Sequence, residues 1–126
     1  MLKVYKKFYE MDIWKDGYEL QKEIFELVKV FPKEEVYGLI SQFNRSANSI
    51  LANIAEAHGR YHYADRIRVL YISRGEIEET QSHLLVASSR GYITEDKAFS
   101  FIERYENLKK KVNGYINNLS QEKNRK

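Results

Sequence analysis

The chain of 126 residues has no cysteine, one proline, 43% hydrophobic residues and a formal net charge of +3. The absence of cysteine excludes disulfides, thiolate catalysis and zinc–thiolate sites, and the composition favours helices over sheet. No apolar run approaches the roughly 20 residues that cross a bilayer, and the charged N-terminus lacks the apolar region of a signal peptide. We expect a cytoplasmic protein with no membrane partner, folded as one domain over residues 1–126.

Apolar residues recur at helical spacing in four segments, which predicts an all-α fold. Pro32 separates the first two helices, because the residue before a proline disfavours helical backbone and proline suits a first helical turn. Gly59 and Gly91 are stop signals, and Thr94 is a suitable N-cap for the last helix. The predicted helices cover about residues 12–30, 33–57, 63–89 and 94–120. Long helices with short connections favour an antiparallel up-down-up-down four-helix bundle.

The third helix has the least regular apolar stripe. Arg74 and Gln81 interrupt the stripe, which consists of Ile67, Leu70, Ile77, Leu84 and Leu85. Gly75 in mid-helix costs about 1 kcal/mol relative to alanine, so a close approach by a neighbouring helix, or a kink, would account for it. Ile72 and Val86 lie near the same face, which favours a second packing surface and makes Gly75 a candidate interface residue.

The second helix carries very little charge. Arg45 is the one charged residue between positions 36 and 55, in a chain in which 31% of residues are charged. A helix on the surface of a monomer normally presents a charged face to water. The low charge therefore predicts that the chain associates with copies of itself and that this helix is enclosed.

Polar side chains recur along the second helix, away from its apolar residues, at Gln42, Arg45, Ser49, Asn53 and Glu56. Buried polar groups need hydrogen-bond partners, so we interpret them as a structural network or subunit interface in which Arg45 or Arg74 meets Glu56. A catalytic cluster is the alternative, but the stripe has no nearby histidine, cysteine or metal set. We therefore expect no enzymatic activity and no catalytic residue.

Two histidines, His58 and His62, have the i, i+4 spacing with which a helix can hold a metal. They fall where a loop with Gly59 is expected, and no acidic third ligand is close. The chain also lacks a glycine-rich phosphate-binding loop. We expect neither a metal nor a cofactor, and we interpret His83 as a surface or interface residue.

The positive charge is concentrated in the second half of the chain. Residues 1–59 hold eight basic and nine acidic side chains, whereas residues 60–126 hold thirteen and nine. The candidates for phosphate contacts are Arg60, Arg66, Arg68, Lys109, Lys110 and Lys111, and Tyr61, Tyr63 and Tyr71 among the arginines could stack on bases. This pattern predicts an oligomeric scaffold that binds RNA or DNA through the phosphate backbone. The alternative is a protein-interaction adaptor whose basic face docks an acidic partner protein without nucleic acid.

A longer pattern surrounds the second helix, consisting of Phe31-Pro32, Glu35, Tyr37-Gly38-Leu39, Gln42, Arg45, Ser49-Ile50, Asn53-Ile54-Ala55-Glu56 and Gly59-Arg60. It is preceded by Trp14 and Leu20, and followed by Ile72, Gly75, Glu79, Leu84, Ala87 and Gly91-Tyr92-Ile93. Over about residues 8–117 the chain resembles the small four-helix bundle proteins encoded by intervening sequences of bacterial large-subunit ribosomal RNA genes. Three positions differ from the family's usual residues: Ala57 replaces glycine, Glu76 replaces serine and Thr80 replaces leucine.

The resemblance implies an antiparallel four-helix bundle that assembles as a homopentamer and has no established enzymatic activity. It implies that the recurrent polar positions of the second helix are architectural. It also extends to the accessory variability proteins of diversity-generating retroelements, which are pentameric barrels with basic surfaces that bind nucleic acid and the reverse transcriptase.

Overall fold

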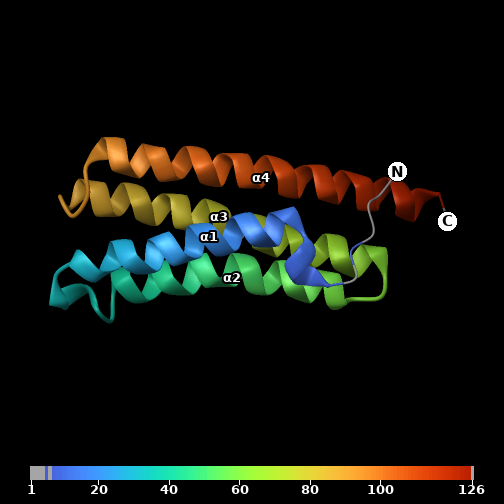
Figure 1. The fold of residues 1–126 in the computed structure, drawn as a ribbon, viewed down its shortest axis with the longest axis horizontal. Coiled ribbons are helices and arrows are strands. Elements are labelled where there is room, and N and C mark those ends of the chain that lie inside the picture. The colour runs from blue at the N-terminus through green and yellow to red at the C-terminus, as the bar shows by residue number, and fades with distance from the viewer. Residues whose placement is uncertain (1–4, 6, 126) are drawn as a thin grey trace.

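The computed structural model describes residues 5 and 7–125 and contains four long helices: α1 (Asp12–Leu27), α2 (Leu39–Gly59), α3 (Tyr63–Ser89) and α4 (Glu95–Asn124). No strand occurs among these residues, and none of the helices is long and apolar enough to cross a membrane. Successive helices run in opposite directions, so the chain forms an up-down-up-down four-helix bundle (Figure 1). One end holds the α1–α2 and α3–α4 connections, and the other holds the α2–α3 turn and the end of α4.

Each helix contributes apolar side chains to one core. Ile24 of α1, Phe43 of α2, Ile77 of α3 and Val112 of α4 have no exposed surface. Tyr105 of α4 is also fully buried, and its hydroxyl has no hydrogen-bond partner among the described residues. Burial disfavours the charged phenolate and raises the pKa of Tyr105 well above its ordinary value.

The buried face of α3 includes polar side chains that apolar spacing alone does not reveal. The Ser73 hydroxyl donates to the backbone carbonyl of Ile50 at 2.9 Å, and the hydroxyl oxygens of Ser46 and Thr80 lie 2.8 Å apart. These bonds satisfy hydroxyls buried between α2 and α3. Leu85, expected on the apolar stripe, is exposed instead, because a helix that turns positions 84 and 87 inward points position 85 about 100° away.

The start of α2 differs from the sequence prediction. The helix begins at Leu39 rather than near residue 33, because Lys33–Glu35 forms a separate 3₁₀ turn and Gly38 has a non-helical backbone (φ −115°, ψ −111°). The Glu35 carboxylate accepts a hydrogen bond from the N–H of Leu39 at 3.2 Å, so it satisfies one of the free donors at the start of the helix. The segment 28–30, predicted as the end of the first helix, is also a 3₁₀ turn.

The predicted signals at the α3–α4 connection are confirmed. Gly91 adopts a left-handed backbone (φ +77°) after the end of α3, a conformation that side chains with a Cβ rarely adopt. The Thr94 hydroxyl accepts a hydrogen bond from the N–H of Lys97 at 3.1 Å and caps α4. The helix continues to Asn124, beyond the predicted end near residue 120.

The Glu35 side chain also joins the two connections at its end of the bundle. Its Oε2 accepts hydrogen bonds from the Tyr92 hydroxyl at 2.7 Å and from Arg90 Nη1 at 2.6 Å. Only 12% of the side chain is exposed. The hydrogen bonds from Tyr92, Leu39 and Arg90 favour the ionised form and hold the pKa of Glu35 below its ordinary value.

Three glycines inside helices differ in their surroundings. A Cβ atom at Gly17 would lie 2.7 Å from Cδ2 of Leu51, so α1 packs closely on α2 there. Nothing in the described part of the chain lies within 4 Å of a Cβ atom at Gly75 or at Gly114. No neighbouring helix of the same chain therefore approaches Gly75 closely, and its approach by a second copy stays a prediction.

In the absence of a contact with another copy, Gly75→Ala and Gly114→Ala should each raise the free energy of unfolding by about 1 kcal/mol, because alanine favours a helix over glycine by that amount. Urea denaturation at one fixed protein concentration, followed by circular dichroism, measures both changes. Gly114 lies outside the candidate interface and serves as the matched control. A loss of stability in Gly75→Ala beside a gain in Gly114→Ala would show that another copy packs against α3.

The Glu35 carboxylate is expected to make stability depend on pH on the acidic side. Because the pKa of Glu35 is lower in the folded chain, its contribution is complete above the unfolded pKa of about 4.3 and is lost as pH falls through the folded pKa. Urea unfolding between pH 6 and pH 3 should show a shallower decline in stability for Glu35→Gln. Glu34→Gln, a change in the exposed neighbour, should keep the original decline; equal declines in all three proteins would contradict this role.

Candidate nucleic-acid interface

Arg45 of α2 lies in a polar cluster that joins α2 to α3. Its Nη1 donates to Glu76 Oε2 at 2.9 Å, its Nη2 donates to Glu79, and its Nε donates to Gln42 Oε1 at 3.1 Å. Nε2 of His83 lies 3.1 Å from Glu79 Oε2. Burial and the nearby Arg45 charge lower the pKa of His83. The cluster is a structural contact between two helices.

The predicted pairing of Arg45 or Arg74 with Glu56 does not form within the chain. Arg45 and Glu56 are about three turns apart on the same straight helix, roughly 16 Å along its axis, so their side chains cannot meet. Glu56 lies 3.6 Å from Nη2 of Arg60 instead. Arg74 points to α4, where its Nη1 donates to Asn113 Oδ1 at 2.8 Å.

The other polar residues of α2 form local contacts. Asn53 Nδ2 donates to the backbone carbonyl and to the hydroxyl of Ser49, at 2.8 and 3.1 Å. His58 lies on α2, whereas His62 lies outside the helix at the N-cap of α3, so the pair does not share a helix face. The described residues contain no group of three or more histidines or carboxylates that could hold a metal ion.

The outer side of α2 is not enclosed by the single chain. Ser41, Asn48 and Ala52 are exposed there, and they provide a surface of small neutral side chains. The two charged side chains of α2, Arg45 and Glu56, are also exposed, at 46% and 53%.

Aromatic side chains of α1 lie beside this surface. Tyr18 and Phe25 remain 40% and 48% exposed, and Trp14 stacks on Tyr18 with ring centroids 4.9 Å apart. Asp16 and Glu23 form ion pairs with α4, and residues two apart on a helix point about 200° apart. Tyr18 and Phe25 therefore lie on the side of α1 away from α4. We call this surface the α1–α2 face. It consists of the half-buried Trp14 and the exposed Tyr18, Phe25, Ser41, Asn48 and Ala52.

The α2–α3 turn places two of the six predicted phosphate-binding residues, Arg60 and Arg66, in contact. Arg68 is two residues from Arg66 on α3 and points about 200° away from it. Arg66 Nε donates to the backbone carbonyl of Arg60 at 2.6 Å, an uncharged acceptor that leaves the positive charge in place. The Arg60–Glu56 pair is exposed and long, so it neutralises Arg60 weakly. Arg68 is exposed, with no hydrogen bond or ion pair among the described residues. Asp65 is the one acidic residue between positions 60 and 68.

The three consecutive lysines of α4 do not join this cluster, and their side chains point in different directions. Nζ of Lys109 lies 2.8 Å from a Glu106 oxygen and 2.6 Å from a Glu78 oxygen, and these contacts raise the pKa of Lys109. Nζ of Lys111 lies 2.6 Å from Asp16 Oδ2, which raises the pKa of Lys111. Carboxylates of the chain itself therefore already compensate two of the three lysines, and the middle one is exposed.

Aromatic rings surround the arginine cluster. An open cavity of about 320 Å³ at the α2–α3 turn is lined by Tyr61, His62, Tyr63 and Arg66. The ring of Tyr61 is 89% exposed and lies nearly perpendicular to that of His62, with centroids 5.0 Å apart. The Arg66 guanidinium lies over the ring of Tyr63, 6.0 Å from its centroid.

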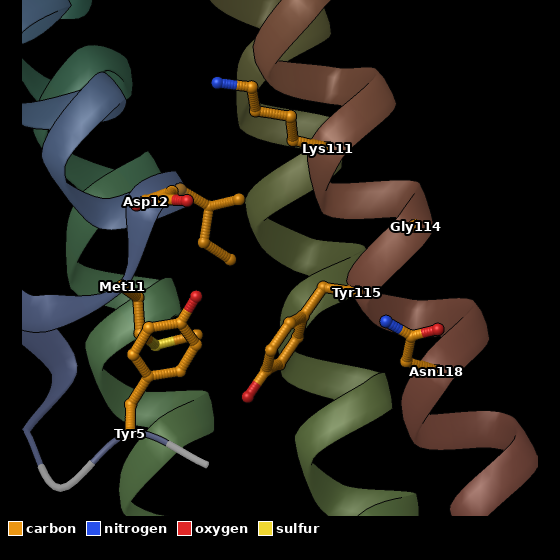
Figure 2. Close-up of a pocket in the computed structure, with 8 residues that line it drawn as sticks. Tyr5, Met11, Asp12, Lys111, Gly114, Tyr115 and Asn118 are labelled. Carbon is orange, nitrogen blue, oxygen red and sulfur yellow. The ribbon is translucent and has the colours of Figure 1, made fainter. Parts of the chain in front are cut away.

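A second cavity, of about 330 Å³, opens between the N-terminal segment and α4 (Figure 2). The rings of Tyr5 and Tyr115 both point into it. Its lining consists of Tyr5, Met11, Asp12, Ile13, Lys111, Gly114, Tyr115 and Asn118. Burial raises the pKa of Tyr115, an effect that the charge of nearby Arg66 opposes. Sequence analysis missed this site because its aromatic walls come from segments more than a hundred residues apart.

Comparison with known proteins gives one family and a related structure. The family model of the 23S rRNA-intervening sequence protein matches residues 9–114. The fold is similar to the 1.70 Å crystal structure of a protein with unknown function from the S23 ribosomal protein family of Bacteroides thetaiotaomicron. The TM-score is 0.76 at 25% sequence identity, and the match covers 83% of this chain and 95% of that one. No curated protein matches the chain.

Proposed function

The chain belongs to the 23S rRNA-intervening sequence protein family, and we propose that it is a non-enzymatic, oligomeric scaffold that binds RNA or DNA through phosphate contacts. The observation that carries this proposal is the arginine cluster at the α2–α3 turn. Arg60, Arg66 and Arg68 lie within nine residues at one end of the bundle, and a single acidic residue lies among them. Guanidinium groups bind phosphate oxygens with strong, paired hydrogen bonds.

Self-association of the chain would strengthen the proposed binding. Three arginines make a weak site in one copy, but several copies that bind one strand together raise the overall affinity. We assign the contact between copies to the α1–α2 face, because interface cores are rich in aromatic residues. The ammonium groups of Lys22 and Lys29 lie over the rings of Tyr18 and Phe25 in the single chain. Four further points rest on the sequence and its resemblance and stay predictions. They are the number of five copies, a second contact at Gly75, the relationship to retroelement accessory proteins and a cytoplasmic location.

Charge placed on the α1–α2 face should break the oligomer. We expect the double variant Tyr18→Glu, Phe25→Glu to shift the mass measured by native mass spectrometry from an oligomer to a monomer, because buried unpaired carboxylates are costly. The control is Phe99→Glu on α4, where the side chain is 52% exposed outside that face. Circular dichroism would verify that both variants stay helical. An unchanged oligomer in the double variant would rule out this face as the contact.

Removal of the three arginine charges should weaken nucleic-acid binding in a salt-dependent way. For the triple variant Arg60→Gln, Arg66→Gln, Arg68→Gln we expect the slope of log affinity against log salt to fall by about three for each engaged copy. Fluorescence anisotropy with labelled RNA and DNA measures it. The triple change of residues 109–111 to glutamine removes the same charge and should have a smaller effect, because carboxylates already hold two of those lysines.

Three outcomes separate the alternatives. Equal effects of the two triple variants would assign binding to overall charge rather than to the turn. A lack of binding by the original chain at the lowest salt would exclude nucleic acid as the ligand. In that case an acidic partner that copurifies with the chain after nuclease treatment would identify the chain as a protein-interaction adaptor.

A further inference from the structure

We propose that the α2–α3 turn binds an unpaired base of single-stranded nucleic acid on the ring of Tyr61, so that the protein prefers single strands to duplexes. This inference rests on the proposed nucleic-acid binding and specifies the class of ligand. It depends on which aromatic rings of the arginine-rich region are open, and on where they lie relative to the guanidinium groups.

Three tyrosines lie among the arginines, and the structure distinguishes them. The ring of Tyr71 lies under the Arg74 guanidinium, 4.6 Å from it, and the ring of Tyr63 is half-buried under Arg66. The ring of Tyr61 is 89% exposed, and no cation covers it among the described residues. Tyr61 is therefore the tyrosine of the three whose ring is available to a flat ligand.

The surroundings of Tyr61 fit a nucleotide rather than an apolar ligand. The ring borders the cavity of about 320 Å³ that Arg66 also lines, a size at the lower end of ligand pockets. Nε of Arg66 is fixed by the backbone carbonyl of Arg60, which leaves the outer edge of the guanidinium for another acceptor. A base on the Tyr61 ring would thus have its phosphate close to the Arg66 guanidinium, as in single-strand binding proteins that combine aromatic stacking with a basic surface.

A duplex cannot use this arrangement. Its bases are stacked on one another, and they present only their edges to a protein through the grooves. Phosphate contacts with Arg60, Arg66 and Arg68 remain possible for a duplex, but the face of a base is out of reach unless it leaves the stack. The stacking contribution therefore applies to single strands alone.

The test compares Tyr61→Ala with the original chain on three probes of about 16 nucleotides: a single-stranded RNA, a single-stranded DNA of the same sequence, and the corresponding DNA duplex. We expect Tyr61→Ala to lose about tenfold in affinity for the single strands, with an unchanged salt slope and unchanged duplex binding. Tyr61→Phe should bind as the original does. Phe99→Ala removes an exposed ring near the start of α4, beside the α3–α4 connection, and should leave all three affinities unchanged.

A fluorescent base analogue, 2-aminopurine, in the single strands reports stacking directly. Its emission should be quenched by the original chain and by Tyr61→Phe, but not by Tyr61→Ala. Unchanged quenching in Tyr61→Ala, or equal losses on single strands and duplex, would overturn the inference while leaving phosphate binding intact. A failure of the original chain to bind any probe would overturn the proposed function as well. The RNA and DNA arms show which sugar the site accepts.

Discussion

The register of α2 depends on one carboxylate. Glu35 caps the N–H of Leu39 and is itself held by Arg90 and Tyr92 from the opposite connection. α2 packs against both α1 and α3, and the cap fixes where this helix begins. With this start Phe43 enters the core, Arg45 meets the carboxylates of α3, and the small neutral side chains of the α1–α2 face turn to the outside.

The two ends of the bundle therefore differ in how their charged groups are paired. At one end a largely buried carboxylate ties both connections together by accepting hydrogen bonds from Arg90 and Tyr92 of the same chain. At the other end the arginines of the α2–α3 turn bond to a backbone carbonyl or to a distant carboxylate, and an aromatic ring is left open. The end that is closed supports the fold, and the end that is open is suited to a ligand.

Sequence reasoning predicted the four helices because their apolar periodicity is local. It misplaced the start of α2 because a cap supplied from outside the helix does not follow helical spacing, and Pro32 with two glutamates is also typical of a first turn. It did not predict that Asp16 of α1 pairs with Lys111 and that Glu78 of α3 pairs with Lys109, because these partners are far apart in the sequence. Two departures from the family pattern, Glu76 and Thr80, have partners on α2, which only the packed helices reveal.

The unequal ends have a consequence for any closed ring of these bundles. Identical copies related by rotation place the same end of every bundle in the same part of the ring. Neighbouring α2–α3 turns around the ring would then be separated by one fixed distance. If the turns bind single strands as proposed, a short strand would reach one turn, whereas a strand long enough to reach the next turn would bind two and gain the effective concentration of the second site. The length of unpaired strand, rather than its base sequence, would then decide which strands stay bound.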